Sequence, residues 1–486
     1  MKKDKFAWIT GGDEKYLEMI EVLAKSLLHY SSYKLIVYGF NCDSNINLPN
    51  VINRRVNFNQ HKKEDINCYT NNGEFDLRDK DYSIYFAKFL ANINSLNENY
   101  DKFAWIDGDA FVTSNIDKSL KYLDGLDDYP LFMRYFHHTT HNWKMVNKIK
   151  LEGQYGTELA NIKNITRNPN DRIVAAGFYF YDRRSISFFQ KCLKWNDELN
   201  HHSIKIWVDE NAFSEERVAN CILWEEGKDK YLPITWNNFY SPNEDIKVKN
   251  RYYLEKGWDN MFDEVTNEVL FIHGPDPSVT SKNAEVLNKA FNDYKSTKLM
   301  IIAHPDDELI FGGVELIYYG EDYKVVCVTN PKNKDRVLEF EKVMKRLKIC
   351  SWEMLDYKDT LYPTQTYYKL DDIINSRKWD KIVTHNPVGE YGHPQHKLIH
   401  DRVKSLTSDF YVFGKSPIKI EKIILDIKLE LLKLYKSGED IVNMLLNNNG
   451  KWFISNDPTT NYVEYESISK YNIKQDNTSY IHCYDK

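Results

Sequence analysis

The sequence predicts an α/β protein built from more than one domain. The N-terminal part opens with an apolar stretch of strand length at Phe6–Thr10, an amphipathic stretch at Lys15–Tyr30 and a second apolar stretch at Lys34–Phe40. This strand–helix–strand order is typical of a parallel sheet with helices on its faces. A similar strand pattern begins again at Leu299–Ala303. Because 486 residues are too many for one hydrophobic core, the chain is expected to divide into two or three domains.

Composition excludes several classes of protein. Hydrophobic residues make up 42% and charged residues 28% of the chain, which is typical of a globular protein. The formal net charge of -6 gives no basis for general nucleic-acid binding. No apolar stretch reaches about 18 residues, so no transmembrane segment is expected. The N-terminus lacks the apolar core of a signal peptide, and the seven cysteines are scattered without a Cys-x-x-Cys pair, so we expect a cytoplasmic protein.

A polar motif, HPDDE, follows the strand predicted at Leu299–Ala303 and precedes an apolar segment with two glycines. In open α/β sheets, ligands bind at the carboxyl ends of the strands. His304 and Asp307 are three residues apart, so both side chains can point to one position if a helix begins within the motif. An imidazole and a carboxylate together suit zinc. Asp306, between them, would face elsewhere and could transfer a proton.

A second polar motif follows the short apolar strand predicted at Lys381–Thr384. Its loop contains two glycines, and then His393 and His396 come three residues apart. One of these histidines can complete a zinc site while the other stays beside it. Three protein ligands and an open fourth position are typical of a catalytic zinc site and not of a structural one.

The two motifs, AHPDDE and GEYGHPQH, resemble those of the LmbE/PIG-L family of zinc-dependent N-acetyl-sugar deacetylases. The resemblance implies three zinc ligands: His304, Asp307 and His396. It implies that Asp306 is the general base and that His393 is an acid or oxyanion stabiliser. Tyr391 would lie near the developing oxyanion, and Arg336, which opens an Arg-x-x-Glu motif, would lie near the substrate. Gln395 stands between the histidines where the family usually has Asp.

A third motif, Asp107-Gly108-Asp109, follows the strand predicted at Lys102–Ile106. Two carboxylates at positions i and i+2 can converge on a hard divalent cation, and the small residue between them allows close approach. Such a cation can hold the diphosphate of a nucleotide-sugar and stabilise the leaving group.

This motif and its surroundings resemble GT-A fold glycosyltransferases, above all the family 8 group that includes glycogenin and lipopolysaccharide hexosyltransferases. The resemblance implies three ligands for Mn²⁺ or Mg²⁺: Asp107, Asp109 and His273. Thr10 and Tyr16 would lie near the base of the nucleotide. Asp209 would lie near the sugar or acceptor, and Glu210 stands beside it where the group has Gln.

The two resemblances place a GT-A-like domain at residues 1–295 and a LmbE/PIG-L-like deacetylase domain at residues 296–486. Residues 275–297, which begin with two prolines and continue as a polar helix, form the expected linker region.

The resemblances imply a bifunctional sugar-modifying enzyme. Its first domain would transfer a hexose from a nucleotide-sugar, such as UDP-GlcNAc, to a glycan or glycoconjugate acceptor. Its second domain would remove the acetyl group of an N-acetylated aminosugar. Two alternatives stay open: a deacetylase whose first domain is an inactive carbohydrate-binding module, and a structural α/β scaffold with two inactive sites.

Overall fold

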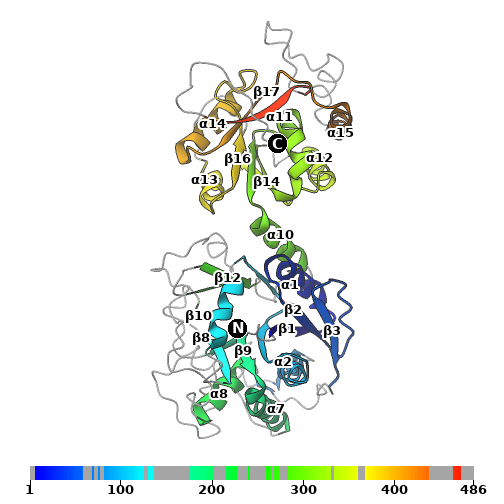
Figure 1. Cartoon of the computed structure of the whole chain (residues 1–486), viewed down its shortest axis with the longest axis vertical. Coiled ribbons are helices and arrows are strands. Elements are labelled where there is room, and N and C mark those ends of the chain that lie inside the picture. The colour runs from blue at the N-terminus through cyan, green and yellow to red at the C-terminus, as the bar shows by residue number, and fades with distance from the viewer. Residues whose placement is uncertain are drawn as a thin grey trace. The chain divides into compact units, whose positions relative to one another are not determined.

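The computed structural model divides the chain into two compact units, Met1–Asn288 and Lys289–Lys486. Each unit is described by itself. The described residues are 6–58, 68–69, 75–76, 81–114, 116–124, 130–135, 174–201, 215–226, 239–240, 259–263, 268–273, 283–329, 333–358, 367–436 and 463–471. Both units are mixed α/β folds, which confirms the predicted fold class (Figure 1).

The first unit contains a six-stranded sheet in the order β3-β2-β1-β6-β9-β8. Its strands are β3 (Val51–Val56), β2 (Lys34–Phe40), β1 (Phe6–Gly12), β6 (Lys102–Ile106), β9 (Val174–Asp182) and β8 (Leu131–Tyr135). The first four strands are parallel, and β9 and β8 run antiparallel to their neighbours. The strands predicted at Phe6–Thr10 and Lys34–Phe40 are therefore confirmed as the centre of a parallel sheet.

Helices cover both faces of this sheet (Figure 1). They are α1 (Leu17–Tyr30), α2 (Asp81–Ser95), α7 (Ile186–His201) and α8 (Glu215–Glu226), with short 3-10 turns η2 (Ile116–Asp124) and η3 (Arg183–Ser185). Phe6 and Trp8 pack with α1 in one apolar cluster. On the opposite face, Phe89 of α2 stacks on Phe189 of α7, which packs against Tyr179 of β9. Burial on both faces explains why the central strands are almost wholly apolar.

A second, antiparallel sheet of the first unit has the order β10-β11-β12-β7. Its strands are β10 (Phe239–Tyr240), β11 (Asp259–Asp263), β12 (Glu268–His273) and β7 (Ala110–Val112). A two-stranded ladder joins β4 (Cys68–Tyr69) and β5 (Phe75–Asp76). Because only the three residues of the DGD motif separate the end of β6 from the start of β7, the motif lies at the junction of the two larger sheets.

The second unit has a six-stranded sheet in the order β15-β14-β13-β16-β17-β18. Its strands are β15 (Ser351–Tyr357), β14 (Tyr323–Thr329), β13 (Lys298–Ile302), β16 (Lys381–Thr384), β17 (Tyr411–Lys415) and β18 (Glu466–Lys470). Only the pairing of β17 with β18 is antiparallel. The chain leaves β13 towards β14 on one side and returns through β16 on the other. This strand order makes the carboxyl end of β13 a topological switch point, where α/β folds bind ligands.

Alternate residues of β13 point to opposite apolar clusters, as expected for a strand buried on both faces. Met300 and Ile302 pack with α11, α12 and α15, whereas Leu299 and Ile301 pack with α13 and α14. These helices are α11 (Asp307–Tyr319), α12 (Lys334–Arg346), α13 (Tyr368–Asn375), α14 (Pro394–Leu406) and α15 (Lys422–Leu432), with a 3-10 turn η5 (Gly320–Asp322) after α11.

Helix α10 (Asn283–Lys295) occupies most of the region expected to be a linker. The division between the two units falls inside this helix, at residues 288 and 289. Its C-terminal end is fixed to the second unit, because Arg377 donates hydrogen bonds to the carbonyl oxygens of Asp293 and Tyr294 at 2.7 Å each. Lys324 also lies 2.7 Å from the Asp293 carboxylate. The end of the linker region is thus part of the second fold and not a free connection.

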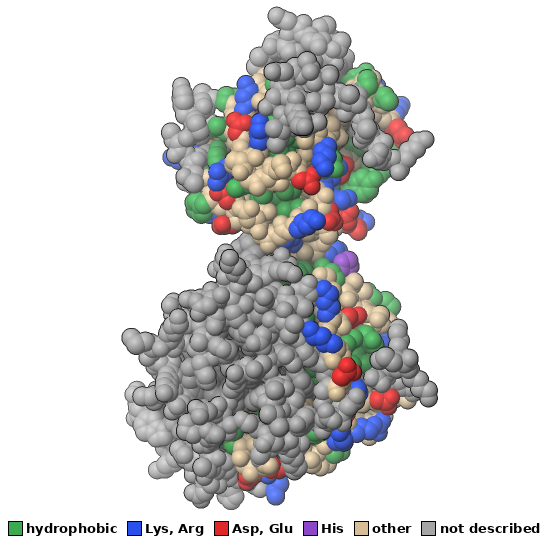
Figure 2. Space-filling model, turned by 60° about the vertical axis from the view of Figure 1, so that its left-hand side comes forward, with side chains coloured by type: hydrophobic (Ala, Val, Ile, Leu, Met, Phe, Trp, Pro, Cys, Tyr) green, Lys and Arg blue, Asp and Glu red, His purple; other side chains and the backbone are tan. Residues whose placement is uncertain are grey.

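On the face drawn in Figure 2, the described Lys and Arg side chains are interspersed with Asp and Glu side chains. This mixture accords with the small net charge of -6. Among the described residues, no helix is long and apolar enough to cross a membrane.

Candidate functional site

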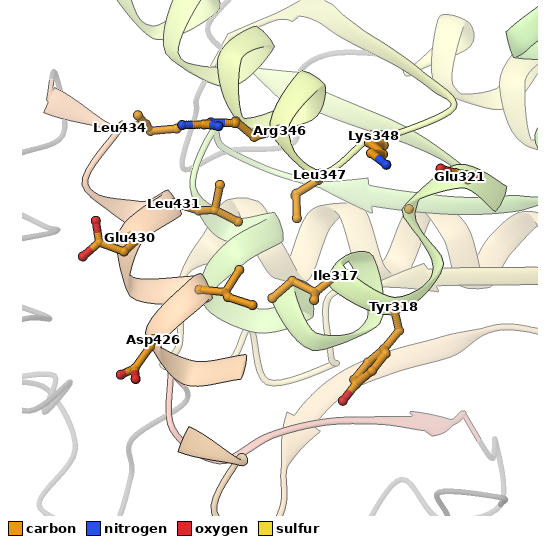
Figure 3. Close-up of a pocket in the computed structure, with 12 residues that line it drawn as sticks. Ile317, Tyr318, Glu321, Arg346, Leu347, Lys348, Asp426, Glu430, Leu431 and Leu434 are labelled. Carbon is orange, nitrogen blue, oxygen red and sulfur yellow. The ribbon is translucent and has the colours of Figure 1, made fainter. Parts of the chain in front are cut away.

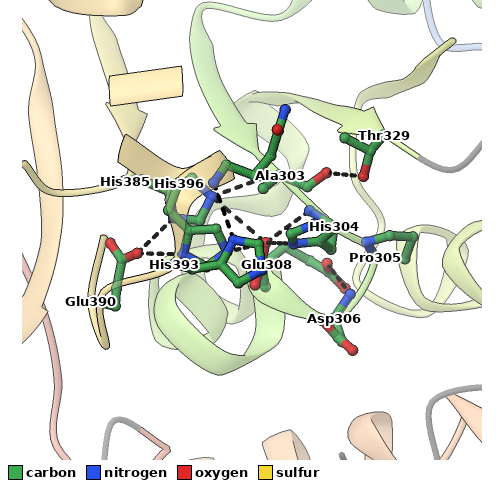
Figure 4. Close-up of polar contacts among 12 residues, drawn as sticks. Ala303, His304, Pro305, Asp306, Glu308, Thr329, His385, Glu390, His393 and His396 are labelled. Carbon is green, nitrogen blue, oxygen red and sulfur yellow. Dashed lines mark hydrogen bonds and ion pairs between the residues drawn. The ribbon is translucent and has the colours of Figure 1, made fainter. Parts of the chain in front are cut away.

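The HPDDE motif forms the turn between β13 and α11. Asp306 has a φ of 105°, in the left-handed region that residues other than glycine rarely adopt. Such a conformation costs roughly 1–3 kcal/mol and is found mostly at functional sites. Arg336 donates to the Pro305 carbonyl at 2.6 Å. The Asp306 N–H donates to Glu308 at 3.0 Å (Figure 4). The Pro305 carbonyl and the Asp306 N–H belong to one peptide unit, and both are therefore hydrogen-bonded to side chains.

Asp307 lies at the centre of the histidines that converge here. Its Oδ2 accepts the His304 backbone N–H at 2.8 Å and lies 3.4 Å from His304 Nδ1. The same oxygen is 3.4 Å from His396 Nε2 and 3.6 Å from His385 Nε2. Burial alone would raise the pKa of Asp307, but His396 and His304 outweigh it and hold the pKa well below its usual value. Asp307 is therefore an ionised carboxylate facing imidazole nitrogens.

His396, on the first turn of α14, has a ring orientation fixed by Glu390. Its Nδ1 lies 2.6 Å from Glu390 Oε2, so Nδ1 carries a proton and donates it. His396 is fully buried, and its Nε2 has no hydrogen-bond partner. A buried nitrogen without a partner is costly, and binding a cation would remove that cost. A carboxylate that fixes the far nitrogen of a ligand histidine is typical of metal sites.

His385 and Glu390 are site residues that the sequence analysis missed. His385 Nε2 accepts the Ala303 N–H at 2.9 Å, and its Nδ1 lies 2.9 Å from Glu390 Oε2 (Figure 4). Both ring nitrogens of His385 are thus engaged, so this histidine links the end of β13 to Glu390 and supports the site. Burial would raise the pKa of Glu390, but His385 and His396 lower it to about 2. The missed signal was a histidine directly after the strand Lys381–Thr384.

His393 stands at the N-cap of α14, and its Nδ1 accepts the Gln395 N–H at 3.2 Å. The ring proton is therefore on Nε2, where it can be donated. The His393 ring centre lies 4.9 Å from that of His304 and 4.7 Å from that of His396. Tyr391 packs beside the same group, with its ring centre 5.8 Å from His393. Gln395 is buried, and its side-chain amide donates to the Tyr367 hydroxyl at 3.2 Å.

Asp306 is buried, and its carboxylate lies 3.2 Å from Arg336. Burial and the neighbouring Asp307 charge raise the pKa of Asp306 to about 7, although Arg336 and the histidines act in the opposite direction. A carboxyl group with a pKa near 7 can both accept and donate a proton near neutral pH. Arg336, predicted to lie near the substrate, is placed by the structure against this carboxylate and the turn that carries it.

Two sets of three donors could each hold a metal ion, with donor atoms within 4.8 Å of one another: His304, His393 and His396, and Asp307, His385 and His396. Since Asp307 Oδ2 lies 3.4 Å from both His304 and His396, the structure also brings the predicted trio together. Two imidazoles and one carboxylate fit zinc. The histidine common to both sets is His396, whose buried Nε2 has no hydrogen-bond partner.

In the first unit, the DGD motif begins directly after β6. Asp107 Oδ1 accepts the Trp105 indole N–H at 2.7 Å and lies 3.2 Å from Lys88 Nζ. The Asp107 N–H donates to the Gly177 carbonyl at 3.0 Å, and a Cβ at Gly177 would lie 3.0 Å from Asp107 Oδ2. The close approach of β9 therefore leaves little room for a side chain at this position. Lys88, which is buried, is a further residue that the sequence analysis missed.

The sheet register places the other predicted ligand beside this motif. His273, the last residue of β12, pairs with Ala110, so its backbone is next to that of Asp109 across the sheet. Thr10 is fully buried, and its Oγ1 has no hydrogen-bond partner. A Cβ at Gly108 would lie 3.7 Å from that oxygen, so Thr10 borders the motif. Tyr16 caps the start of α1. Asp209 and Glu210 lie outside the described residues.

Parts of the chain match a known protein family and a curated protein. Residues 299–407 match the family model described as PIG-L: GlcNAc-PI de-N-acetylase. A protein of Acanthamoeba polyphaga mimivirus, named uncharacterized protein L374, is 34% identical over 176 residues, which cover 32% of this chain and 77% of that protein. The chain belongs to the family of this viral protein. Its second unit, which contains the match to the PIG-L model, is called the PIG-L unit below.

Solved structures also resemble parts of the chain. A galactosyltransferase, LgtC, with donor and acceptor sugar analogues has a TM-score of 0.30 and 13% identity, over 51% of this chain and 77% of that one. An N,N'-diacetylchitobiose deacetylase from Pyrococcus horikoshii has a TM-score of 0.27 and 15% identity, over 39% of this chain and 89% of that one. Structural similarity at these TM-scores gives no information about the function of this chain.

The PIG-L unit also has an open surface pocket of about 780 Å³ (Figure 3). Its floor includes Ile317, Leu347 and Leu431, and its rim carries charged side chains such as Arg346 and Glu430. These residues come from the C-terminal ends of α11 and α12 and from α15, whereas His304 precedes α11 and His393 and His396 lie at the start of α14. None of the predicted site residues lines this pocket.

Proposed function

We propose that the PIG-L unit is a zinc-dependent hydrolase that removes the acetyl group from an N-acetylated aminosugar. The observation that carries this proposal is the buried Nε2 of His396, which makes no hydrogen bond and faces the Asp307 carboxylate at 3.4 Å, while Glu390 holds the other ring nitrogen. His304, Asp307 and His396 would hold the metal. When bound, zinc would supply Lewis-acid polarisation and would lower the pKa of water.

The chain's own residues would handle the protons. Asp306, whose pKa is raised to about 7 by burial and by Asp307, would accept a proton from the attacking water. The amide oxygen gains negative charge as its carbon becomes tetrahedral. The His393 Nε2–H is the donor available to stabilise that charge, with Tyr391 beside it. Asp306 or His393 would then give a proton to the amine that leaves.

The substrate class can be tested with the full chain. We expect metal-loaded protein to release acetate from an N-acetylglucosamine-containing sugar and to leave a product lighter by one acetyl group. Mass spectrometry over free N-acetylglucosamine, the nucleotide-sugar and glycosylated acceptors would identify the preferred form. Failure on every N-acetylated sugar, in protein that contains zinc, would contradict the proposed substrate class.

For the first unit, we propose metal-dependent transfer of a hexose from a nucleotide-sugar such as UDP-GlcNAc to a glycan or glycoconjugate acceptor. Asp107, Asp109 and His273 would hold Mn²⁺ or Mg²⁺. The proposal is supported by the carboxylates that follow β6 and by the register that sets His273 next to Asp109. When bound, the cation would offset the charge of the diphosphate leaving group.

The scattered cysteines favour a cytoplasmic location.

One observation favours the alternative of a carbohydrate-binding module without turnover. Lys88 already places a buried ammonium 3.2 Å from Asp107 Oδ1, which partly neutralises a proposed metal ligand. Hydrolysis or transfer of the donor in the presence of Mn²⁺ would separate transferase from module, because a module binds the sugar and leaves it intact.

The two activities are expected to separate by mutation. Asp109→Ala should reduce transfer about 100-fold or more, because a cation worth several kcal/mol of charge stabilisation would be lost. Acetate release from a ready-made aminosugar should stay unchanged. Asp101→Ala, which removes an exposed carboxylate just before β6, is the matched control. If Asp109→Ala abolished both activities in folded protein, the two sites would not be independent.

A further inference from the structure

The peptide unit between Pro305 and Asp306 is clamped on both sides. Its carbonyl accepts from Arg336 of α12 at 2.6 Å, and its N–H donates to Oε2 of Glu308 at 3.0 Å. Since Asp306 has a φ of 105°, these two bonds hold a conformation that the backbone would otherwise leave. The direction of the Asp306 carboxylate depends on this peptide plane.

Glu308 is itself held by a hydrogen bond from another side chain. It is fully buried, and Oε1 accepts a hydrogen bond from the hydroxyl of Tyr435, which is 1% exposed. Tyr435 lies three residues after the end of α15, beyond the region 299–407 that matches the PIG-L family model. A residue outside the family match is therefore two hydrogen bonds away from the Asp306 backbone.

The position of α15 is fixed against α11 by a buried ion pair. Lys428 of α15 donates to the Ile310 carbonyl at 3.0 Å and to Glu466 of β18 at 2.6 Å. Glu466 also accepts the Val314 N–H at 2.9 Å. A Cβ at Gly313 would lie 3.1 Å from the Lys428 side chain, so α15 approaches α11 closely. These contacts fix the position of α15 against α11. They therefore also fix the position of Tyr435 beside Glu308.

We propose that Tyr435 is a positioning residue for deacetylation, which acts through Glu308 to fix the Pro305–Asp306 peptide and so to aim the Asp306 carboxylate. This inference rests on the proposed function of the PIG-L unit. Tyr435 touches neither the substrate nor the metal ligands in this account. Its effect should therefore fall on the chemical step and not on metal or substrate binding.

Tyr435→Phe tests the inference, with Tyr323→Phe as the matched control. Tyr323 is also fully buried, and its hydroxyl donates to Glu315 on the same helix, α11, at 2.6 Å. We expect Tyr435→Phe to lower kcat about 10- to 100-fold with KM and zinc content unchanged, because a small misplacement of a catalytic group has effects of that size. Tyr323→Phe should leave kcat unchanged. Equal effects of the two variants on kcat would overturn the inference.

A second measurement needs no substrate. Hydrogen exchange of the Asp306 amide should become about tenfold faster in Tyr435→Phe and in Glu308→Ala, and should stay unchanged in Tyr323→Phe. Suppose that the wild-type chain released no acetate but that the exchange rates changed in this way. The proposed function would then be wrong, whereas the role of Tyr435 and Glu308 in holding the Pro305–Asp306 peptide would be confirmed. If acetate were released but the Asp306 amide exchanged at the same rate in all variants, the role of Tyr435 in holding this peptide would be wrong. The proposed function would not be affected.

Discussion

His396→Ala is expected to abolish zinc binding by the PIG-L unit and, with it, deacetylation. The variant removes the buried Nε2 that faces Asp307, and it leaves Glu390 with one histidine fewer. Removal of one partner from a buried charged group commonly costs about 3–5 kcal/mol, so the melting temperature should also fall. The measurement is zinc per chain by elemental analysis, together with thermal unfolding.

His400→Ala is the matched control for this experiment. His400 lies one turn later on α14, is equally buried, and donates through Nδ1 to the His385 carbonyl at 2.8 Å. It should lose stability but keep zinc. Because His396→Ala could fail to fold, His396→Gln provides a second variant of similar size. One equivalent of tightly bound zinc in either folded His396 variant would show that the ligand assignment is wrong.

Asp306→Asn is expected to lower the rate of deacetylation about 10²- to 10⁴-fold, the range attributed to a general base. Zinc content should not change, because the amide removes the base and leaves the three proposed ligands in place. Comparison of kcat and zinc content between variant and wild type checks this. Asp335→Asn, an exposed position beside Arg336 in the first turn of α12, should behave as wild type. Full activity of Asp306→Asn would exclude Asp306 as the base.

The local pattern of the sequence was enough to place the strands and the two polar motifs. Leu299–Ala303 and Lys381–Thr384 are apolar runs that end in polar residues, and the structure places them as neighbouring strands β13 and β16. The convergence of His304 and His396 at their carboxyl ends follows from parallel pairing, which the strand–helix alternation predicts.

The supports of the site could not be predicted, because they depend on contacts between residues far apart in the chain. The bond from the Ala303 N–H to His385 joins residues 82 apart, and the bond from Tyr435 to Glu308 joins residues 127 apart. No spacing rule connects such positions. Lys88 was missed for the same reason, since only the fold of the first unit brings α2 to the end of β6.

The left-handed conformation of Asp306 was also not predictable. Local preference assigns a positive φ mainly to glycine and only occasionally to asparagine or aspartate, so nothing in the sequence marks Asp306. The turn adopts it because Arg336 and Glu308 hold both polar groups of the preceding peptide.

The most direct test of the central claim, that the PIG-L unit is a metal-dependent deacetylase, is a titration of metal-free full-length protein with zinc while acetate release is measured. We expect activity to rise in proportion to added zinc and to level off at one equivalent per chain, and we expect Asp306→Asn to bind the same equivalent with little acetate released. Acetate release by the metal-free chain at the rate of the zinc-loaded chain would contradict it.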